Sequence, residues 1–235
     1  MTADPRGNMP PSLLAVTIDG PAGSGKSTMA RLLAKKLGAV MIDTGAMYRA
    51  VTARVIDNGV DPDDETAVAR VAREIHLRFA GEDSRQVLVD GEDESARIRQ
   101  ADVNALVSKI SAYPQVRSEL VGLQRKMAEG GPVVMEGRDT GSVVLPQARF
   151  KFFLVAGPDV RAERRRLEIA QAGESRDHKE VLEGITARDL QDSQRAVSPL
   201  VKPEGAVEID TSQLDIDEVL ERMLVLIVSD KYEAS

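Results

Sequence analysis

Short apolar runs that end near carboxylates recur along the chain. The first is Leu13 to Asp19, and a shorter one is Ala39 to Asp43. Continuous apolar runs of this length are typical of parallel strands buried on both faces. Three later runs have the same character, at Pro132 to Glu136, Arg149 to Val155 and Ala206 to Asp210. The pattern therefore predicts five buried strands.

Helical spacing follows most of these runs. After the first run, the apolar positions are Met29, Leu32, Leu33 and Leu37, and Gly38 is a helix stop. After the second they are Met47, Val51 and Val55, ending at Asn58-Gly59. Longer helical patterns begin near Pro158 and Ile216. Strands alternating with helices predict an α/β fold, a doubly wound five-stranded parallel sheet with helices on both faces.

The region from Asp61 to Gly131 has a different pattern. Strand-like segments at His76 to Ala80 and Gln86 to Asp90 flank GEDSR, and the turn-rich GEDES follows, which favours a small antiparallel meander. Helical patterns follow around Ala101 to Ala112 and Gln115 to Ala128. We expect an inserted lobe at 61–130, a core at 13–60 and 131–235, a lid at about 158–180 with a polar loop at Glu174 to Lys179, and a disordered lead-in at 1–12.

Composition narrows the chemistry. The 235 residues include no cysteine, so thiolate nucleophiles and zinc-thiolate sites are excluded. The two histidines, His76 and His178, are far apart in sequence and make a poor metal cluster, so histidine chemistry is disfavoured. A formal charge of −7 opposes broad binding to nucleic acid. The longest apolar runs fall short of the ~20 residues that span a bilayer, and the start lacks a signal pattern. We expect a cytoplasmic monomer.

The segment GPAGSGKS, Gly20 to Ser27, satisfies G-x-x-x-x-G-K-[ST] between a predicted strand and a predicted helix. In this phosphate-binding loop, or P-loop, backbone N–H groups and the helix N-terminus face phosphate oxygens, Lys26 reaches the outer phosphates, and the Ser27 hydroxyl binds Mg²⁺. A glycine turn before a structural helix is the alternative. A guanine-reading N-K-x-D segment and an LSGGQ-like transporter signature are absent, which favours a small-molecule kinase whose donor is a nucleoside triphosphate with magnesium.

Arginines paired with carboxylates indicate where an anionic acceptor binds. Thr44 and Arg49 follow the second strand, and Arg138 and Asp139 follow the run at Pro132 to Glu136, where open α/β sheets bind ligands. A third group, Arg188, Asp192 and Arg195, lies at i, i+4 and i+7.

Each group has an alternative. Three alternatives remain open: Arg49 is a solvated helical arginine, Arg138 and Asp139 form a loop ion pair, and the third group forms a surface salt-bridge stripe. RAERRR, Arg161 to Arg166, is either solvated or part of a lid. Glu136 is either a metal-orienting carboxylate or a turn residue.

In order, IDGPAGSGKST, DTGAMYR, EGRDTGSVV and RDLQDSQRAVSPL resemble the bacterial cytidylate kinase family over roughly Leu13 to Val228. The resemblance implies transfer of the γ-phosphoryl group of ATP to CMP or dCMP, with Mg²⁺. It implies the following roles: catalysis by Lys26, Arg138 and Arg188; ATP binding by Gly20, Ala22, Gly23, Ser24, Gly25, Lys26, Ser27 and Thr28, with Arg164 and Arg165 in the lid; and acceptor binding by Thr44, Arg49, Ser108, Arg117, Arg138, Asp139, Arg188 and Asp192.

Two further hypotheses stay open at this point. One is a P-loop kinase for another small anion, such as another nucleotide or shikimate. The other is a nucleotide-sensing module that binds ATP and CMP without turnover. No long apolar stripe is left over for a protein partner once the core helices are assigned.

Overall fold

The computed structural model describes residues 14–81, 84–171, 173–195 and 197–233. Its centre is a parallel sheet with strand order β2-β6-β1-β7-β8, so the predicted doubly wound five-stranded sheet is confirmed. The expected lead-in at 1–12 lies outside the described residues. The strands are β1 (Ala15–Asp19), β2 (Val40–Asp43), β6 (Val133–Gly137), β7 (Phe150–Val155) and β8 (Val207–Asp210).

Alternating side chains of the sheet serve two separate cores. Val16, Ile18 and Val134 pack with the helices α1 (Lys26–Leu37) and α8 (Ile216–Glu233) on one face. Val133 and Met135 pack on the other face, against α2 (Thr44–Asp57) and α5 (Pro114–Ala128). Because both faces are covered, the strands carry the continuous apolar runs seen in the sequence.

The inserted lobe contains the predicted meander, an antiparallel sheet ordered β3-β4-β5. It also contains α3, which the sequence did not predict because its buried face consists of Val68 and the small residues Ala69 and Ala72, a weak apolar signal. The elements of the lobe are α3 (Glu65–Glu74), β3 (Leu77–Ala80), β4 (Gln86–Val89), β5 (Glu92–Asp93), a 3₁₀ turn (Arg97–Arg99), α4 (Ala101–Ile110) and α5.

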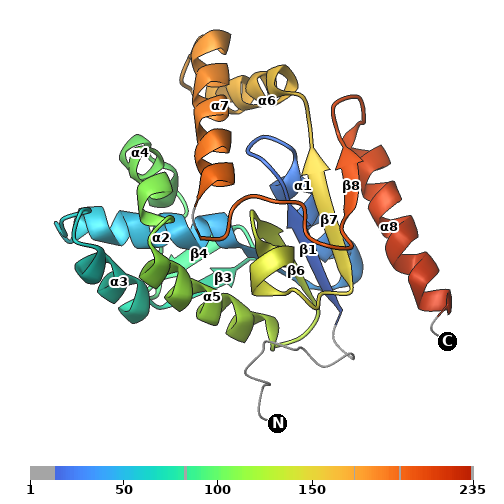
Figure 1. The fold of residues 1–235 in the computed structure, drawn as a ribbon, viewed down its shortest axis with the longest axis horizontal. Helices are drawn as coiled ribbons and strands as arrows, with labels where there is room; N and C mark the ends of the chain where they lie inside the picture. Colours follow the sequence, from blue (N-terminus) through green and yellow to red (C-terminus); the bar gives the residue numbers. More distant parts are fainter. Residues whose placement is uncertain (1–13, 82–83, 172, 196, 234–235) are drawn as a thin grey trace.

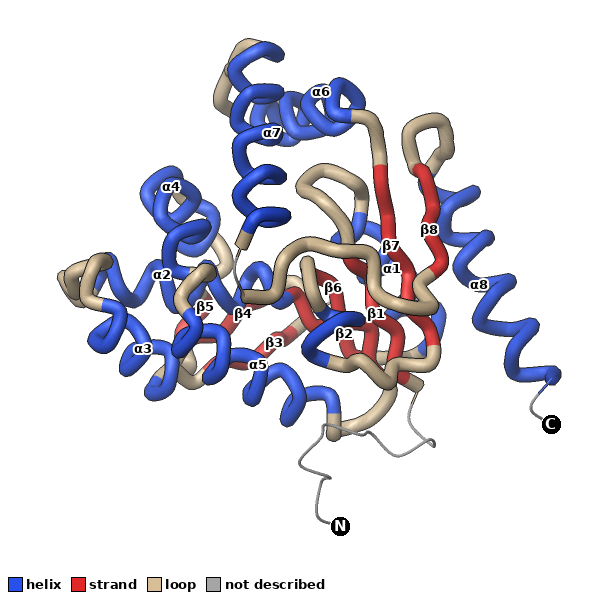
Figure 2. Tube along the Cα trace, in the orientation of Figure 1, coloured by secondary structure: helices blue, strands red, loops and turns tan. Residues whose placement is uncertain are grey.

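Two helices stand beyond the carboxyl ends of the strands, α6 (Pro158–Gln171) and α7 (His178–Gln194) (Figure 1). They pack on each other through Ala162, Val181 and Ile185. The expected polar loop, Glu174 to Lys179, ends two residues earlier than predicted, because Asp177 caps α7 by accepting from the N–H of Lys179. Figure 2 shows the loop after α7 running across the sheet toward β8. The lobe and these two helices thus lie on either side of the carboxyl ends of the strands.

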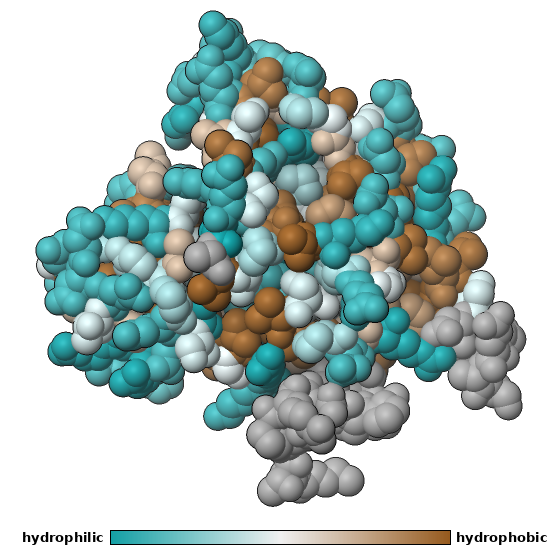
Figure 3. Space-filling model, viewed as in Figure 1, coloured by the Kyte–Doolittle hydropathy of each residue, from teal (hydrophilic) through white to brown (hydrophobic). Residues whose placement is uncertain are grey.

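The surface agrees with this division. In the view of Figure 3, hydrophilic residues dominate the outer faces of the lobe and of α6 and α7, and the outline is notched between them. Among the described residues, no helix is long and apolar enough to cross a membrane.

Candidate functional site

The P-loop joins β1 to α1 and depends on glycine at two close approaches. Gly20 has φ 147°, and a Cβ there would lie 2.1 Å from the carbonyl oxygen of Leu154. Gly23 has φ 75°, and a Cβ there would lie 3.1 Å from Arg161 Cβ. Both positions combine positive φ with crowding, so other residues are strained there. The loop therefore fits closely against β7 and α6.

Lys26 occupies the first turn of α1 and is buried. Its Nζ donates to Pro21 O at 2.7 Å, and the Ser24 hydroxyl donates to the same oxygen at 3.0 Å. Burial and the charge of Arg138 lower the pKa of the Lys26 ammonium, while Glu136 and Asp19 oppose that shift. An anionic phosphate would favour the charged form of this lysine.

Ser27 and Glu136 form the candidate metal site. The Ser27 hydroxyl donates to Glu136 Oε1 at 2.5 Å, and Glu136 is buried at the end of β6. Burial raises the pKa of the Glu136 carboxyl, with Asp43 adding to the shift. A hydroxyl beside a buried carboxylate suits Mg²⁺, which takes few protein ligands plus phosphate oxygens. No group of three or more His, Cys, Asp or Glu side chains that could hold a metal ion exists among the described residues.

We expect Glu136→Gln to stabilise the protein without nucleotide, increasingly as pH rises. A carboxyl whose pKa is raised by folding binds more protons in the folded than in the unfolded state. The wild-type protein therefore loses stability as pH rises from the ordinary glutamate range toward neutrality. Glutamine keeps the acceptor for Ser27 and lacks this loss. Thermal unfolding at pH 5 and pH 8 measures this effect. The difference in melting temperature between the variant and the wild type should be about 2–4 °C larger at pH 8 than at pH 5. An equal difference at both pH values would contradict the burial argument.

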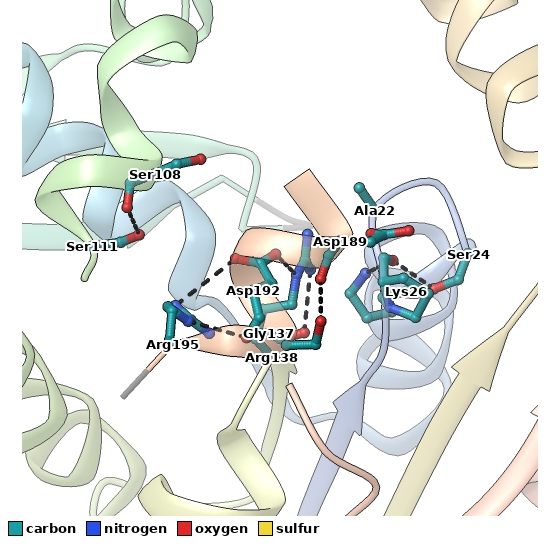
Figure 4. Close-up of polar contacts among 12 residues, drawn as sticks. Ala22, Ser24, Lys26, Ser108, Ser111, Gly137, Arg138, Asp189, Asp192 and Arg195 are labelled. Carbon is teal, nitrogen blue, oxygen red and sulfur yellow. Dashed lines mark hydrogen bonds and ion pairs between the residues drawn. The ribbon is translucent and has the colours of Figure 1, made fainter. Parts of the chain in front are cut away.

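Arg138 and Asp192 form an ion pair between the end of β6 and helix α7. Arg138 Nε donates to Asp192 Oδ2 at 2.8 Å, and Asp192 is buried. Burial alone would raise the pKa of Asp192, but Arg138 and Arg195 hold it below its ordinary value. In Figure 4, Asp192 and Arg195 lie beside Arg138, and Lys26 lies on the P-loop to the right of this group. The pair therefore connects α7 to the P-loop side of the sheet.

The observed ion pairs are neither the loop ion pair nor the surface salt-bridge stripe that the sequence left open. Arg138 pairs with Asp192 rather than Asp139, so no local loop pair forms. Asp192 bonds to another element rather than forming a surface stripe. Arg195 is not on the helix, because α7 ends at Gln194 and Arg195 has extended backbone angles, φ −57° and ψ 135°. It still contacts Asp192, at 3.9 Å between Nη1 and Oδ1.

Arg49 and Arg188 add two more cations to this group. Arg49 donates to Asn104 on α4, so it is not merely a solvated helical arginine. Burial and the repulsion of Arg138 lower the pKa of Arg188 to about 10, with Arg49 adding to the repulsion. Arg188 Nε is buried with no hydrogen-bond partner. A cluster of mutually repelling arginines with an unpaired donor indicates an anion-binding site.

Arg117 and Asp139 form a buried ion pair across the junction of α5 and β6. Arg117 also donates to Ser111 O at 3.1 Å and lies 5.4 Å from the centroid of the Tyr48 ring. Its Nε is buried without a partner. The pair thus offers an acceptor and a donor in a low-dielectric setting.

The two remaining predicted acceptor residues, Thr44 and Ser108, lie outside the two ion pairs. The Thr44 hydroxyl is buried and donates to Glu136 O at 2.8 Å. Ser108 lies on α4, apart from the Arg138 group, and its carbonyl accepts from the Ser111 hydroxyl at 3.1 Å (Figure 4). Thr44 is thus part of the β6–α2 packing, and Ser108 faces the site from the lobe.

The predicted lid arginines have separate partners. Arg164 donates to both oxygens of Thr211, at 2.9 Å and 2.6 Å. Arg165 pairs with Glu168 on its own helix at 2.9 Å. Arg164 therefore connects α6 to the segment after β8, while Arg165 lies in a half-exposed helical pair.

Sequence reasoning missed Asp19 as a site residue. Its buried carboxylate accepts from Thr140 N at 2.8 Å, from Thr140 Oγ1 at 2.9 Å and from Gly141 N at 2.7 Å. Burial raises its pKa, and the two backbone N–H groups oppose that shift. Asp19 thus joins the strand before the P-loop to the π-helical turn at Thr140–Val144, directly after Arg138 and Asp139. Its place at a strand end beside Gly20 was the available signal.

Comparison with known proteins follows this geometry. Residues 16–229 match the family model described as cytidylate kinase. A cytidylate kinase from Caldanaerobacter subterraneus subsp. tengcongensis is 50% identical over 88% of this chain and 92% of its own length. Another from Pelotomaculum thermopropionicum is 48% identical over 91% of this chain and 95% of its own. A third, from Desulfitobacterium hafniense, is 44% identical over 94% of each.

Proposed function

The chain belongs to the cytidylate kinase family and transfers the γ-phosphoryl group of ATP to CMP or dCMP, and on this premise we propose a role for each part of its site. The observation that carries the assignment is the placement of Arg138. Its guanidinium pairs with Asp192 on α7 and is near enough to Lys26 to affect the pKa of that ammonium. One cationic group therefore borders both the P-loop and the acceptor side.

The P-loop holds the donor. The backbone N–H groups of Gly20 and of residues 22–28 surround the triphosphate, and Lys26 exchanges its bond to Pro21 O for the outer phosphate oxygens. Ser27 and Glu136 hold Mg²⁺, which neutralises charge on the β- and γ-phosphates when bound. Arg164 and Arg165 belong to a lid at about 158–180 that excludes water.

The acceptor binds between the core (13–60 and 131–235) and the lobe (61–130). Arg49, Arg138 and Arg188 hold its phosphate, Asp192 orients Arg138 and contacts the ribose, and Thr44 and Ser108 border the nucleoside. These groups position the attacking phosphate oxygen and stabilise charge on the transferring group, so no covalent enzyme intermediate is needed. We propose a cytoplasmic monomer without nucleic-acid or membrane partners.

Release of ADP tests this function directly. CMP, dCMP, UMP, AMP and shikimate are offered separately at equal concentration with ATP and Mg²⁺, and ADP is followed by a coupled optical assay. Fast release with CMP and dCMP, slow release with UMP and none with the others is expected. Fast release with shikimate or AMP would contradict the proposed acceptor site, and binding of ATP and CMP without ADP would indicate a sensing module.

Asp139→Asn is expected to reduce the preference for CMP over UMP about tenfold or more. The Asp139 carboxylate accepts from the exocyclic amine of cytosine while Arg117 donates to the ring edge, and an amide removes half of that acceptor capacity. The ratio of kcat/KM for CMP to that for UMP measures the effect, with the KM for ATP as the internal control. An unchanged ratio would remove Asp139 from base recognition.

A further inference from the structure

Arg161 is the first arginine of RAERRR, and unlike the others it is buried. Its Nε donates to Ala156 O at 2.9 Å, directly after β7. Its Nη1 donates to Ala22 O in the P-loop at 3.1 Å and to Asp189 Oδ2 on α7 at 2.5 Å. One side chain on α6 therefore bonds to the sheet, the P-loop and the neighbouring helix.

The bond to Ala22 O determines how the P-loop presents its amides. In a trans peptide the carbonyl and the following N–H point in opposite directions. Holding Ala22 O toward Arg161 therefore directs the N–H of Gly23 away from α6. Gly23 also packs against Arg161, with 3.1 Å from a Cβ position to Arg161 Cβ and to its carbonyl oxygen. This peptide has little room to rotate unless Arg161 moves.

The bond to Asp189 determines the position of α7. Helix α7 also carries Arg188 and Asp192, and Asp192 bonds to Arg138 at 2.8 Å. In Figure 4, Asp189 lies beside Ala22, and Asp192 of the same helix lies beside Arg138. The helix is thus fixed at two points, one on the P-loop side and one on the acceptor side, with Arg188 adjacent to the first.

We propose that Arg161 and Asp189 are positioning residues that hold the P-loop amides and helix α7 in one geometry. This inference rests on the proposed function of the P-loop as the triphosphate site. The pair touches no reacting group; it acts through the Gly23 N–H and through Arg188. Breaking it frees the donor loop and α6 from α7, so ATP is held less well and water reaches the γ-phosphate.

Arg161→Met and Asp189→Ala test the proposal. Each is expected to raise the KM for ATP about tenfold and lower kcat about tenfold, since small misplacements of reacting groups cost up to about a hundredfold. Because the bond from Arg138 to Asp192 still holds α7 on the acceptor side, the KM for CMP should rise less than the KM for ATP. ATP hydrolysis without acceptor should rise relative to transfer. The double variant should be little worse than either single variant, because the residues act as a unit.

The matched control is Arg166→Met, on the same helix, where Arg166 pairs with the half-exposed Glu163 at 2.6 Å. Wild type and control must both phosphorylate CMP; failure of both would refute the proposed function and not the positioning role alone. If Arg161→Met does not fold, Asp189→Ala decides, because Asp189 is partly exposed. A lower melting temperature with unchanged KM for ATP and unchanged hydrolysis ratio would show a purely structural pair and overturn the proposal.

Discussion

Replacing Lys26 with alanine lowers kcat for CMP phosphorylation by about a thousandfold, the effect of removing one pre-placed donor from a developing charge. Lys26 is buried and bonded to Pro21 O, so its ammonium already lies at the P-loop before ATP binds. No other lysine of α1 replaces it, because Lys35 and Lys36 lie in the last turn of the helix and are exposed. Coupled ADP release at saturating ATP and CMP measures the loss.

Lys35→Ala is the matched control for Lys26→Ala. It removes the same charge from the same helix at an exposed position, so kcat should stay within about twofold of the wild type. Circular dichroism shows whether Lys26→Ala is folded, and thermal unfolding gives its stability. A folded Lys26→Ala enzyme that keeps more than a tenth of wild-type kcat would contradict the role of Lys26.

The elements that form the donor site could be predicted because their signals are local. A buried strand, a glycine loop and a helix with apolar positions four residues apart are adjacent in sequence, and β1, the P-loop and α1 follow that order. The positions of Arg138 directly after β6 and of Arg49 in the first half of the helix after β2 were likewise predictable, since the carboxyl ends of parallel strands meet at one side of the sheet. The periodic pattern thus predicted which elements meet at the site.

The partners within the site could not be predicted because they are not local. Asp139 follows Arg138 in sequence, yet it pairs with Arg117 on α5, while Arg138 pairs with Asp192 on α7. Arg161 looked like the other arginines of RAERRR, but only it is buried against the P-loop. Composition and spacing do not show which side of a helix packs inward when polar residues cover several faces.

Arg188→Met is expected to lower kcat about a hundredfold or more while raising the melting temperature of the protein without nucleotide. Arg188 is a half-buried cation whose Nε is buried without a hydrogen-bond partner, and Arg138 and Arg49 repel it. Those conditions disfavour the charged guanidinium until phosphate binds, when the same charge stabilises the transferring group. Methionine fills a similar volume without the charge. Replacing Arg188 should therefore lower activity and raise the free energy of unfolding without nucleotide by about 1 kcal/mol.

Arg176→Met is the control for this substitution, because Arg176 lies near the start of α7 and pairs only loosely with the exposed Glu174 and Glu180 at 3.8 Å and 3.7 Å. It should leave kcat and the melting temperature nearly unchanged. For Arg188→Met, thermal unfolding should show a rise of about 2–4 °C without nucleotide, shrinking when CMP is added because the wild type then gains more. A lower melting temperature without nucleotide would mean that Arg188 stabilises the fold, and the proposal that it is held ready for phosphate would fail.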